Sequence, residues 1–185
     1  MRFLFVFLVP FSLIICPCPG KGGGTTTKYL KKIQFPPEDD QITYKVTGVK
    51  DGDTFVLLMD GKQQAVRFAH IDCPEKGQPY GNRAKKFVSD LCFASFVSLI
   101  QHGEYDRNKR LIAEVILPDG RNLNKELVRH GLAWHFKKYS TDKEYAQLET
   151  LARSRRIGLW SDPNPVAPWL WRKQMRKRKK MSTIE

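Results

Sequence analysis

The chain has 185 residues, of which 41% are hydrophobic and 11% aromatic, enough apolar material for one packed domain with extensions at its ends. This composition excludes a globally disordered chain. The formal net charge of +13 favours polyanionic partners, with nucleic acid first and an anionic membrane surface second.

The N-terminal segment has the pattern of a secretory signal peptide. Arg2 supplies a short positive region, residues 3–15 are almost continuously apolar, and small residues from Cys16 to Gly20 offer cleavage sites. The apolar run is shorter than the about 20 residues that cross a hydrocarbon core. We therefore expect residues 1–20 to direct secretion or export to the periplasm, with an uncleaved or lipidated membrane anchor as the alternative.

The regions on either side of the folded domain differ in composition from it. Residues 21–40 are rich in Gly, Thr and Pro, which predicts a flexible linker. We expect the folded domain to span residues 41–171. Residues 172–185 follow as a basic tail, in which seven of the first nine residues are Lys or Arg.

This tail has two interpretations from sequence. It is either a solvated, disordered end or a segment that holds phosphates loosely beside the domain, with Trp169 and Trp171 available to stack on bases. In both interpretations it lies outside the acidic motif of the domain.

Five segments with apolar alternation predict short strands, at residues 42–49, 54–59, 64–71, 97–100 and 111–117. Residues 51–53 form a turn between the first two strands, and Asp60-Gly61 predicts a tight hairpin between the second and third.

Three segments have helical patterns, at residues 84–91, 123–130 and 141–157. Asn122 is the expected N-cap of the second helix and Gly131 its end. Thr141 opens an expected capping box for the third helix, and Gly158 ends it. Together these elements predict an α+β fold that is mainly β, a five-stranded Greek-key barrel of the OB type with about three helices.

Residues with chemical potential gather in three short segments, at 51–54 (DGDT), 67–75 (RFAHIDCPE) and 106–110 (DRNKR). Asp53 and Asp72 offer the hard oxygen ligands that Ca²⁺ or Mg²⁺ takes. A divalent cation held there acts as a Lewis acid on a phosphoryl oxygen.

The basic residues of these segments fit a phosphate. The planar guanidinium groups of Arg67 and Arg110 donate paired hydrogen bonds to phosphate oxygens. Glu75 lies close enough in sequence to Asp72 to serve as a general base. No protein nucleophile stands out, so the combination favours hydrolysis of a phosphodiester by an activated water.

Each segment also has an ordinary structural interpretation. DGDT is common as a hairpin turn, Arg67 within a strand is often a barrel-rim residue, and Pro74 simply ends a strand. The functional interpretation depends on the combination of segments and on their order along the chain.

The cysteines and histidines carry weaker signals. Cys92 falls on the apolar edge of an expected helix, which predicts a buried, unpaired thiol, with a bridge to Cys73 as the alternative. No Cys or His cluster has zinc-ligand spacing, so the sequence argues against a zinc site. The spacing of the histidines does not support a His-based nuclease site either.

Taken together, the motifs resemble those of the thermonuclease (staphylococcal nuclease-like) family. The three segments occur in the order found in that family, and the likeness continues through residues 124–133 and 158–160. It covers about residues 42–171. The resemblance implies an exported, calcium-dependent endonuclease, acting as a monomer on DNA and RNA and leaving 3′-phosphate and 5′-hydroxyl ends. A non-catalytic OB-fold protein that binds nucleic acid is the alternative.

The resemblance also implies a role for each site residue. Asp53 and Asp72 correspond to carboxylate ligands of Ca²⁺, and Cys73 to a ligand through its backbone carbonyl. Arg67 and Arg110 correspond to the residues that bind the scissile phosphate, and Glu75 to the residue that activates water.

Two further residues are weaker candidates for substrate contact. Asn108-Lys109 replaces a Tyr-Gly pair of the family and Lys137 replaces another aromatic residue, which leaves Lys109 and Tyr139 to contact the substrate.

Overall fold

The computed structural model of the protein describes residues 42–182. The expected signal peptide, linker and final three residues lie outside this range, so residues 1–20 and 21–40 keep their sequence-based predictions. Within residues 42–182, none of the helices has the length and apolar character needed to span a membrane.

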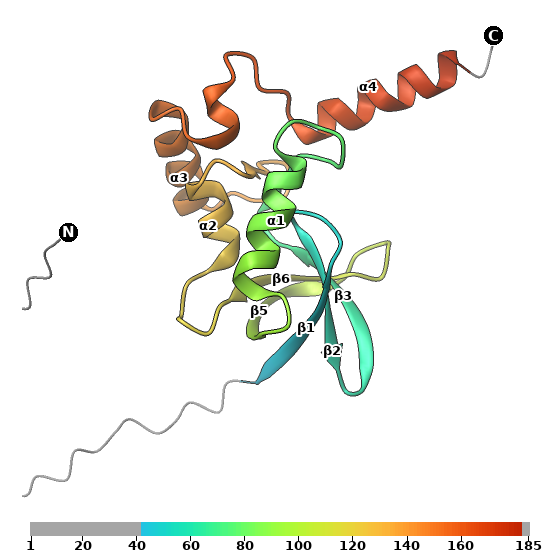
Figure 1. Ribbon diagram of the computed structural model, residues 1–185, viewed down its shortest axis with the longest axis vertical. Coiled ribbons are helices and arrows are strands. Elements are labelled where there is room, and N and C mark those ends of the chain that lie inside the picture. Colours follow the sequence, from blue (N-terminus) through green and yellow to red (C-terminus); the bar gives the residue numbers. More distant parts are fainter. Residues whose placement is uncertain (1–41, 183–185) are drawn as a thin grey trace, which may run out of the picture. The chain divides into compact units, whose positions relative to one another are not determined.

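Five strands close into a barrel in the order β1-β2-β3-β6-β5, with β5 returning to pair with β1 (Figure 1). Neighbouring strands are antiparallel, except β3 and β6, which run parallel. The barrel strands are β1 Thr43–Val49, β2 Thr54–Met59, β3 Lys62–Phe68, β5 Phe96–Tyr105 and β6 Leu111–Ile116. The predicted five-stranded barrel is confirmed.

The link after β3 differs from the sequence prediction. Instead of one strand over 64–71, β3 ends at Phe68, and a two-residue strand β4, Ile71–Asp72, pairs with β7, Trp134–His135. The break occurs because His70 adopts a left-handed backbone with φ of 67°. The chain therefore leaves the barrel just before Asp72. By contrast, Asp60 and Gly61 have φ of 49° and 74°, the tight hairpin turn that the sequence predicts.

The three predicted helices are present, and a fourth adds to them. The α-helices are α1 Gly81–Cys92, α2 Leu123–Arg129, α3 Lys143–Ser154 and α4 Pro168–Met181, with a short 3₁₀ helix η1 at Gly158–Ser161. Asn122 caps α2 as expected, since its side chain accepts from the Lys125 amide. The cap of α3 is Asp142 rather than Thr141, because Asp142 accepts from the Glu144 and Tyr145 amides.

The boundary expected between residues 171 and 172 falls inside helix α4. Pro168 occupies the first turn, where a missing amide costs nothing, and the Lys and Arg residues after it are good helix formers. Basic side chains in the last turn also complement the helix dipole. Residues 172–181 are thus helical and not a disordered tail, and Figure 1 shows α4 projecting from the rest of the described chain toward the C-terminus.

The core is filled by apolar side chains from the barrel and from α1 and α2. Its largest fully buried members include Phe55, Leu57, Phe68, Leu123 and Leu127. Cys73 and Cys92 are both buried and unpaired, as the sequence predicts for Cys92.

One buried polar residue ties helix α2 to the barrel. The Asn124 amide donates to the carbonyls of Ala69 and Ala113, at 3.0 and 3.2 Å, and its oxygen accepts from the Val115 amide at 3.1 Å. These bonds fix the end of β3 against β6, and thereby the position from which the chain turns toward Asp72.

Candidate active site

The three sequence segments meet around one cleft with a volume of about 930 Å³. Its walls include Asp53, Arg67, Asp72, Glu75 and Arg110, so all five of these side chains face one space. They come from the start of β2, the end of β3, β4 and the loops that follow β4 and β5.

The turn before β2 aims Asp53 into the site. The Asp51 carboxylate accepts from the Asp53 amide at 3.1 Å, which holds the turn closed. Gly52 packs so closely that an added Cβ would lie 2.6 Å from Ala84 Cβ and 2.9 Å from Cys73 Cβ. Packing therefore requires glycine at position 52 of this motif.

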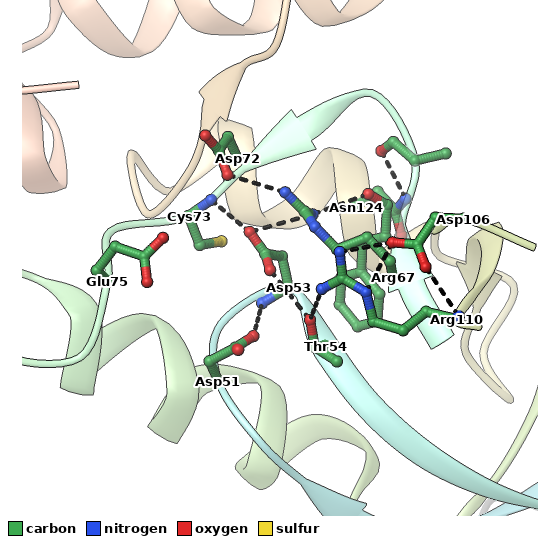
Figure 2. A network of polar contacts seen from close by, with 12 residues as sticks. Asp51, Asp53, Thr54, Arg67, Asp72, Cys73, Glu75, Asp106, Arg110 and Asn124 are labelled. Atoms are coloured by element: carbon green, nitrogen blue, oxygen red, sulfur yellow. Dashed lines mark hydrogen bonds and ion pairs between the residues drawn. The ribbon is translucent and has the colours of Figure 1, made fainter. Parts of the chain in front are cut away.

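Arg67 lies between the two acidic residues expected to bind metal. Its guanidinium approaches Asp53 Oδ2 at 3.1 Å and Asp72 Oδ1 at 2.8 Å (Figure 2). Burial lowers the pKa of Arg67, but the charges of Asp53 and Asp72 outweigh burial and raise it. The Cys73 backbone amide donates to Asp53 Oδ2 at 2.6 Å, which places the Cys73 backbone beside the same carboxylate.

Arg110 is held by Asp106, a residue without a predicted role. Asp106 Oδ2 accepts from Arg110 Nε at 2.9 Å and Nη2 at 2.7 Å, while Oδ1 accepts from the Arg110 and Asn108 amides. Arg110 Nη1 also donates to Thr54 Oγ1 at 3.3 Å. Asp106 thus folds the loop and orients Arg110 toward the start of β2.

A third arginine enters the site from helix α4. Arg172 Nη2 donates to Asp72 Oδ2 at 2.7 Å, and its Nη1 contacts Asp72 Oδ1 at 3.2 Å and Glu75 Oε1 at 2.5 Å. The expectation that residues beyond 171 lie outside the acidic motif is wrong. The helix that starts at Pro168 brings its second turn over Asp72 and Glu75, and residue spacing along the chain does not reveal this approach.

The carboxylates of the cleft are crowded. Burial raises the pKa of Asp72, and burial together with the charge of Asp53 raises the pKa of Asp51 to about 6. Several carboxylates whose charge is disfavoured fit a divalent cation, and their hard oxygens suit Ca²⁺ or Mg²⁺. Asp53 and Asp72 therefore fit the metal-ligand role that the sequence predicts for them.

The Cys73 thiol is poorly suited to bind a metal ion. Burial and the charge of Asp53 raise its pKa well above the ordinary value, so the thiol stays protonated. The raised pKa disfavours a thiolate ligand, so the backbone of Cys73 is the better candidate for contact with a metal ion.

Of the two residues expected to contact the substrate, Tyr139 and Lys109, only Tyr139 lines the cleft. Tyr139 lies there with 71% of its surface exposed.

Trp169 stacks on Phe136 at a centroid distance of 5.5 Å and meets Trp134 edge-on at 5.6 Å. Trp169 thus helps to anchor α4, and it borders a neighbouring groove of about 600 Å³ that is also lined by Arg176.

The fold also brings together two histidines and a glutamate that lie far apart in the sequence. His70, His102 and Glu114 place one potential ligand atom each within 4.8 Å of the others. The absence of zinc-ligand spacing in the sequence does not exclude this group, because these residues come together only when β5 and β6 lie beside the link between β3 and β4.

The chain is similar to known proteins along most of the described domain. A family model described as "Staphylococcal nuclease homologue" matches residues 65–162, which run from β3 to η1 and leave α4 outside. A protein of Haemophilus influenzae named "Uncharacterized endonuclease" is 43% identical over 133 residues, covering 71% of this chain and 74% of that protein.

Two further relatives have similar coverage. An "Uncharacterized endonuclease" of Escherichia coli O157:H7 is 38% identical over 149 residues, or 78% of this chain and 97% of the relative. A "Micrococcal nuclease" of Shigella flexneri is 38% identical over 139 residues, or 70% of this chain and 79% of the relative.

Proposed function

The chain belongs to the family of staphylococcal nuclease homologues, and from this premise we propose that it is an exported, calcium-dependent endonuclease of DNA and RNA. We propose further that it breaks the bond to the 5′ oxygen and leaves 3′-phosphate and 5′-hydroxyl ends. One observation carries the proposal: Asp53, Arg67 and Asp72 form a linked set, with Glu75 and Arg110 on the walls of the same cleft.

The protein is a nuclease, and its residues divide the work of hydrolysis. Arg67 and Arg110 bind the scissile phosphate and stabilise the charge that develops on its oxygens. Glu75 accepts a proton from the attacking water as the new bond to phosphorus forms. Because Arg67 is paired with both acidic residues, a bound phosphate competes for a guanidinium that is already in place.

Asp53 and Asp72 would hold the metal ion, with the Cys73 backbone beside them. When bound, the ion polarises a phosphoryl oxygen and neutralises charge. We propose Ca²⁺ because an all-oxygen set of carboxylates and a backbone carbonyl suits its preference for hard oxygen ligands.

Export and assembly are part of the proposal. The signal-like residues 1–20 support secretion or periplasmic export, with membrane attachment if this segment is retained or lipidated. We propose a monomer, since one chain supplies all the proposed catalytic and metal-binding residues.

Product analysis tests the proposal. Short 5′-labelled single-stranded DNA and RNA are digested in Ca²⁺, and the fragments are offered to a polymerase that extends only 3′-hydroxyl ends. We expect no extension until a phosphatase has removed the 3′-phosphate, and no fragments from the Arg67→Ala variant. Fragments that extend directly would contradict the proposed bond. Tight binding with no fragments from the wild-type protein would favour the non-catalytic alternative.

A further inference from the structure

We propose that His70, His102 and Glu114 form a second metal site, separate from the Asp53 and Asp72 pair, that binds a divalent transition-metal ion of the zinc class. Its three ligands come from the link after β3, from β5 and from β6.

The distances between the ligand atoms match such a site. Glu114 Oε1 lies 3.0 Å from His70 Nε2 and 3.2 Å from His102 Nε2. A tetrahedral ion with bonds of about 2.0–2.2 Å holds neighbouring ligand atoms about 3.3 Å apart. Glu114 Oε1 therefore already lies at nearly the required spacing from each imidazole nitrogen, and all three ligand atoms lie within 4.8 Å of one another.

The other polar atoms of His70 and Glu114 have partners outside the cluster. His70 Nδ1 lies 2.9 Å from Ser140 Oγ, and the Asn122 amide donates to Glu114 Oε2. Hydrogen bonds of this kind fix the orientation of metal-binding imidazoles and carboxylates. As a result, His70 Nε2 and Glu114 Oε1 are the atoms that face one another.

His70 Nε2 is completely buried, and among residues 42–182 it makes no hydrogen bond of good geometry. It is 3.0 Å from Glu114 Oε1, with which it can form an ion pair only when the imidazole is protonated. Buried polar atoms in proteins are nearly always satisfied, by protein, water or an ion. An ion between the imidazoles and the carboxylate would satisfy this one.

The backbone holds His70 in place for this role. Its φ of 67° is unusual for a residue other than glycine. The Phe136 amide donates to the His70 carbonyl at 2.8 Å, and Asn124 holds the preceding carbonyl of Ala69 at 3.0 Å. The surrounding structure thus fixes the direction in which the imidazole points.

The donor set selects the kind of ion. Two imidazole nitrogens and one carboxylate oxygen suit Zn²⁺ and its neighbours in the first transition row, whereas Ca²⁺ takes six to eight oxygens. Three protein ligands leave a tetrahedral ion one open position. His70 and His102 both line the cleft of the candidate active site, so water or a phosphate oxygen can reach that position.

Cobalt serves as the probe, because tetrahedral Co²⁺ gives strong visible absorption where Zn²⁺ is silent. The full chain, made without a histidine tag, is titrated with Co²⁺ in excess Ca²⁺ to saturate the acidic site. We expect one equivalent of tetrahedral Co²⁺ that Zn²⁺ displaces. His102→Gln should weaken Co²⁺ binding at least about 100-fold, because losing even an outer hydrogen bond to a ligand costs 10–100-fold.

Matched variants separate this site from the acidic one. His102 is 36% exposed on its side chain, so His102→Gln should keep the fold, which circular dichroism checks. His130→Gln alters a histidine outside the cluster and should leave the absorption unchanged, as should Asp53→Asn. Absence of the tetrahedral bands, or their survival in His102→Gln, would overturn the proposal. If the tetrahedral Co²⁺ bands disappeared in Asp53→Asn and remained in His102→Gln, the ion would belong to the acidic site instead. None of these readouts requires nuclease activity.

Discussion

Arg172 and Asp72, 100 residues apart in the chain, are joined by two contacts, from Nη2 to Oδ2 at 2.7 Å and from Nη1 to Oδ1 at 3.2 Å. Asp72 Oδ1 also accepts from Arg67 at 2.8 Å. A carboxylate that we expect to bind Ca²⁺ is therefore held by two guanidinium groups, one from the barrel and one from α4. Metal and Arg172 compete for Asp72, and this competition can be measured.

Removing Arg172 should strengthen calcium binding to the free protein. In Arg172→Ala we expect the Ca²⁺ affinity to rise about fivefold by calorimetry, the equivalent of about 1 kcal/mol for a partly exposed ion pair. Arg176→Ala, one turn further along α4, is the control and should leave the affinity unchanged. A lower affinity in Arg172→Ala would mean that Arg172 instead holds Asp72 and Glu75 in position for the ion.

The three proposed catalytic side chains should be needed for turnover and not for folding. Arg67→Ala, Arg110→Ala and Glu75→Gln should each lower kcat by about 10²–10³, the usual effect of removing one preorganised group that stabilises the transition state. Arg121→Ala, whose partner Asp119 is exposed, should behave like the wild type. Single-turnover rates and circular dichroism check the series, and normal rates in any two of the three variants would refute the assignment.

The Asn124 side chain should be a major source of stability. Asn124→Ala removes three hydrogen bonds and leaves buried backbone groups of Ala69, Ala113 and Val115 without them. We expect the free energy of unfolding to fall by about 3 kcal/mol in urea titrations, since one orphaned buried group costs about 1–3 kcal/mol. Asn108→Ala, in an exposed loop, is the comparison variant. Equal stability of the two variants would show that the buried network carries little free energy.

Two truncations of α4 should separate substrate binding from effects on the site. Deletion of residues 173–185 removes six of the seven basic residues of α4 but keeps Arg172. It should raise KM at moderate salt and leave kcat almost unchanged. The slope of log affinity against log salt concentration should become shallower by about 0.7 for each phosphate that the shortened helix no longer binds. Deletion of residues 168–185 also removes Arg172, and should change calcium affinity as well. Identical salt slopes for the full chain and the shorter deletion would show that the end of α4 does not contact the substrate.

Much of the barrel can be predicted because its signals are local. Asp60-Gly61 adopts the turn that its residue types favour, and Asn122 and Gly131 begin and end α2 as expected. The strand predicted over residues 64–71 runs too far at its C-terminal end, because β3 ends at Phe68. Nothing in the local pattern shows that His70 takes a left-handed backbone. That conformation is held by contacts with residues far along the chain.

The site can be predicted only in part for the same reason. Asp53 and Arg67 come together because the pairing of β2 with β3 sets Thr54 opposite Arg67, and Asp72 follows five residues later on β4. The sequence does not reveal Arg172, because its position depends on how α4 packs through Trp169 against Phe136. Nor does it reveal His102 and Glu114, which face each other only across the pairing of β5 with β6.

The most direct test of the central claim is cleavage of single-stranded DNA by the purified protein with Ca²⁺, with a chelator, and with Ca²⁺ restored after chelation. The proposed function predicts fragments in Ca²⁺, none in chelator and full recovery on restoration, with no recovery for an Asp53→Asn, Asp72→Asn double variant that remains folded. Equal cleavage in excess chelator, or full activity of the double variant, would contradict it.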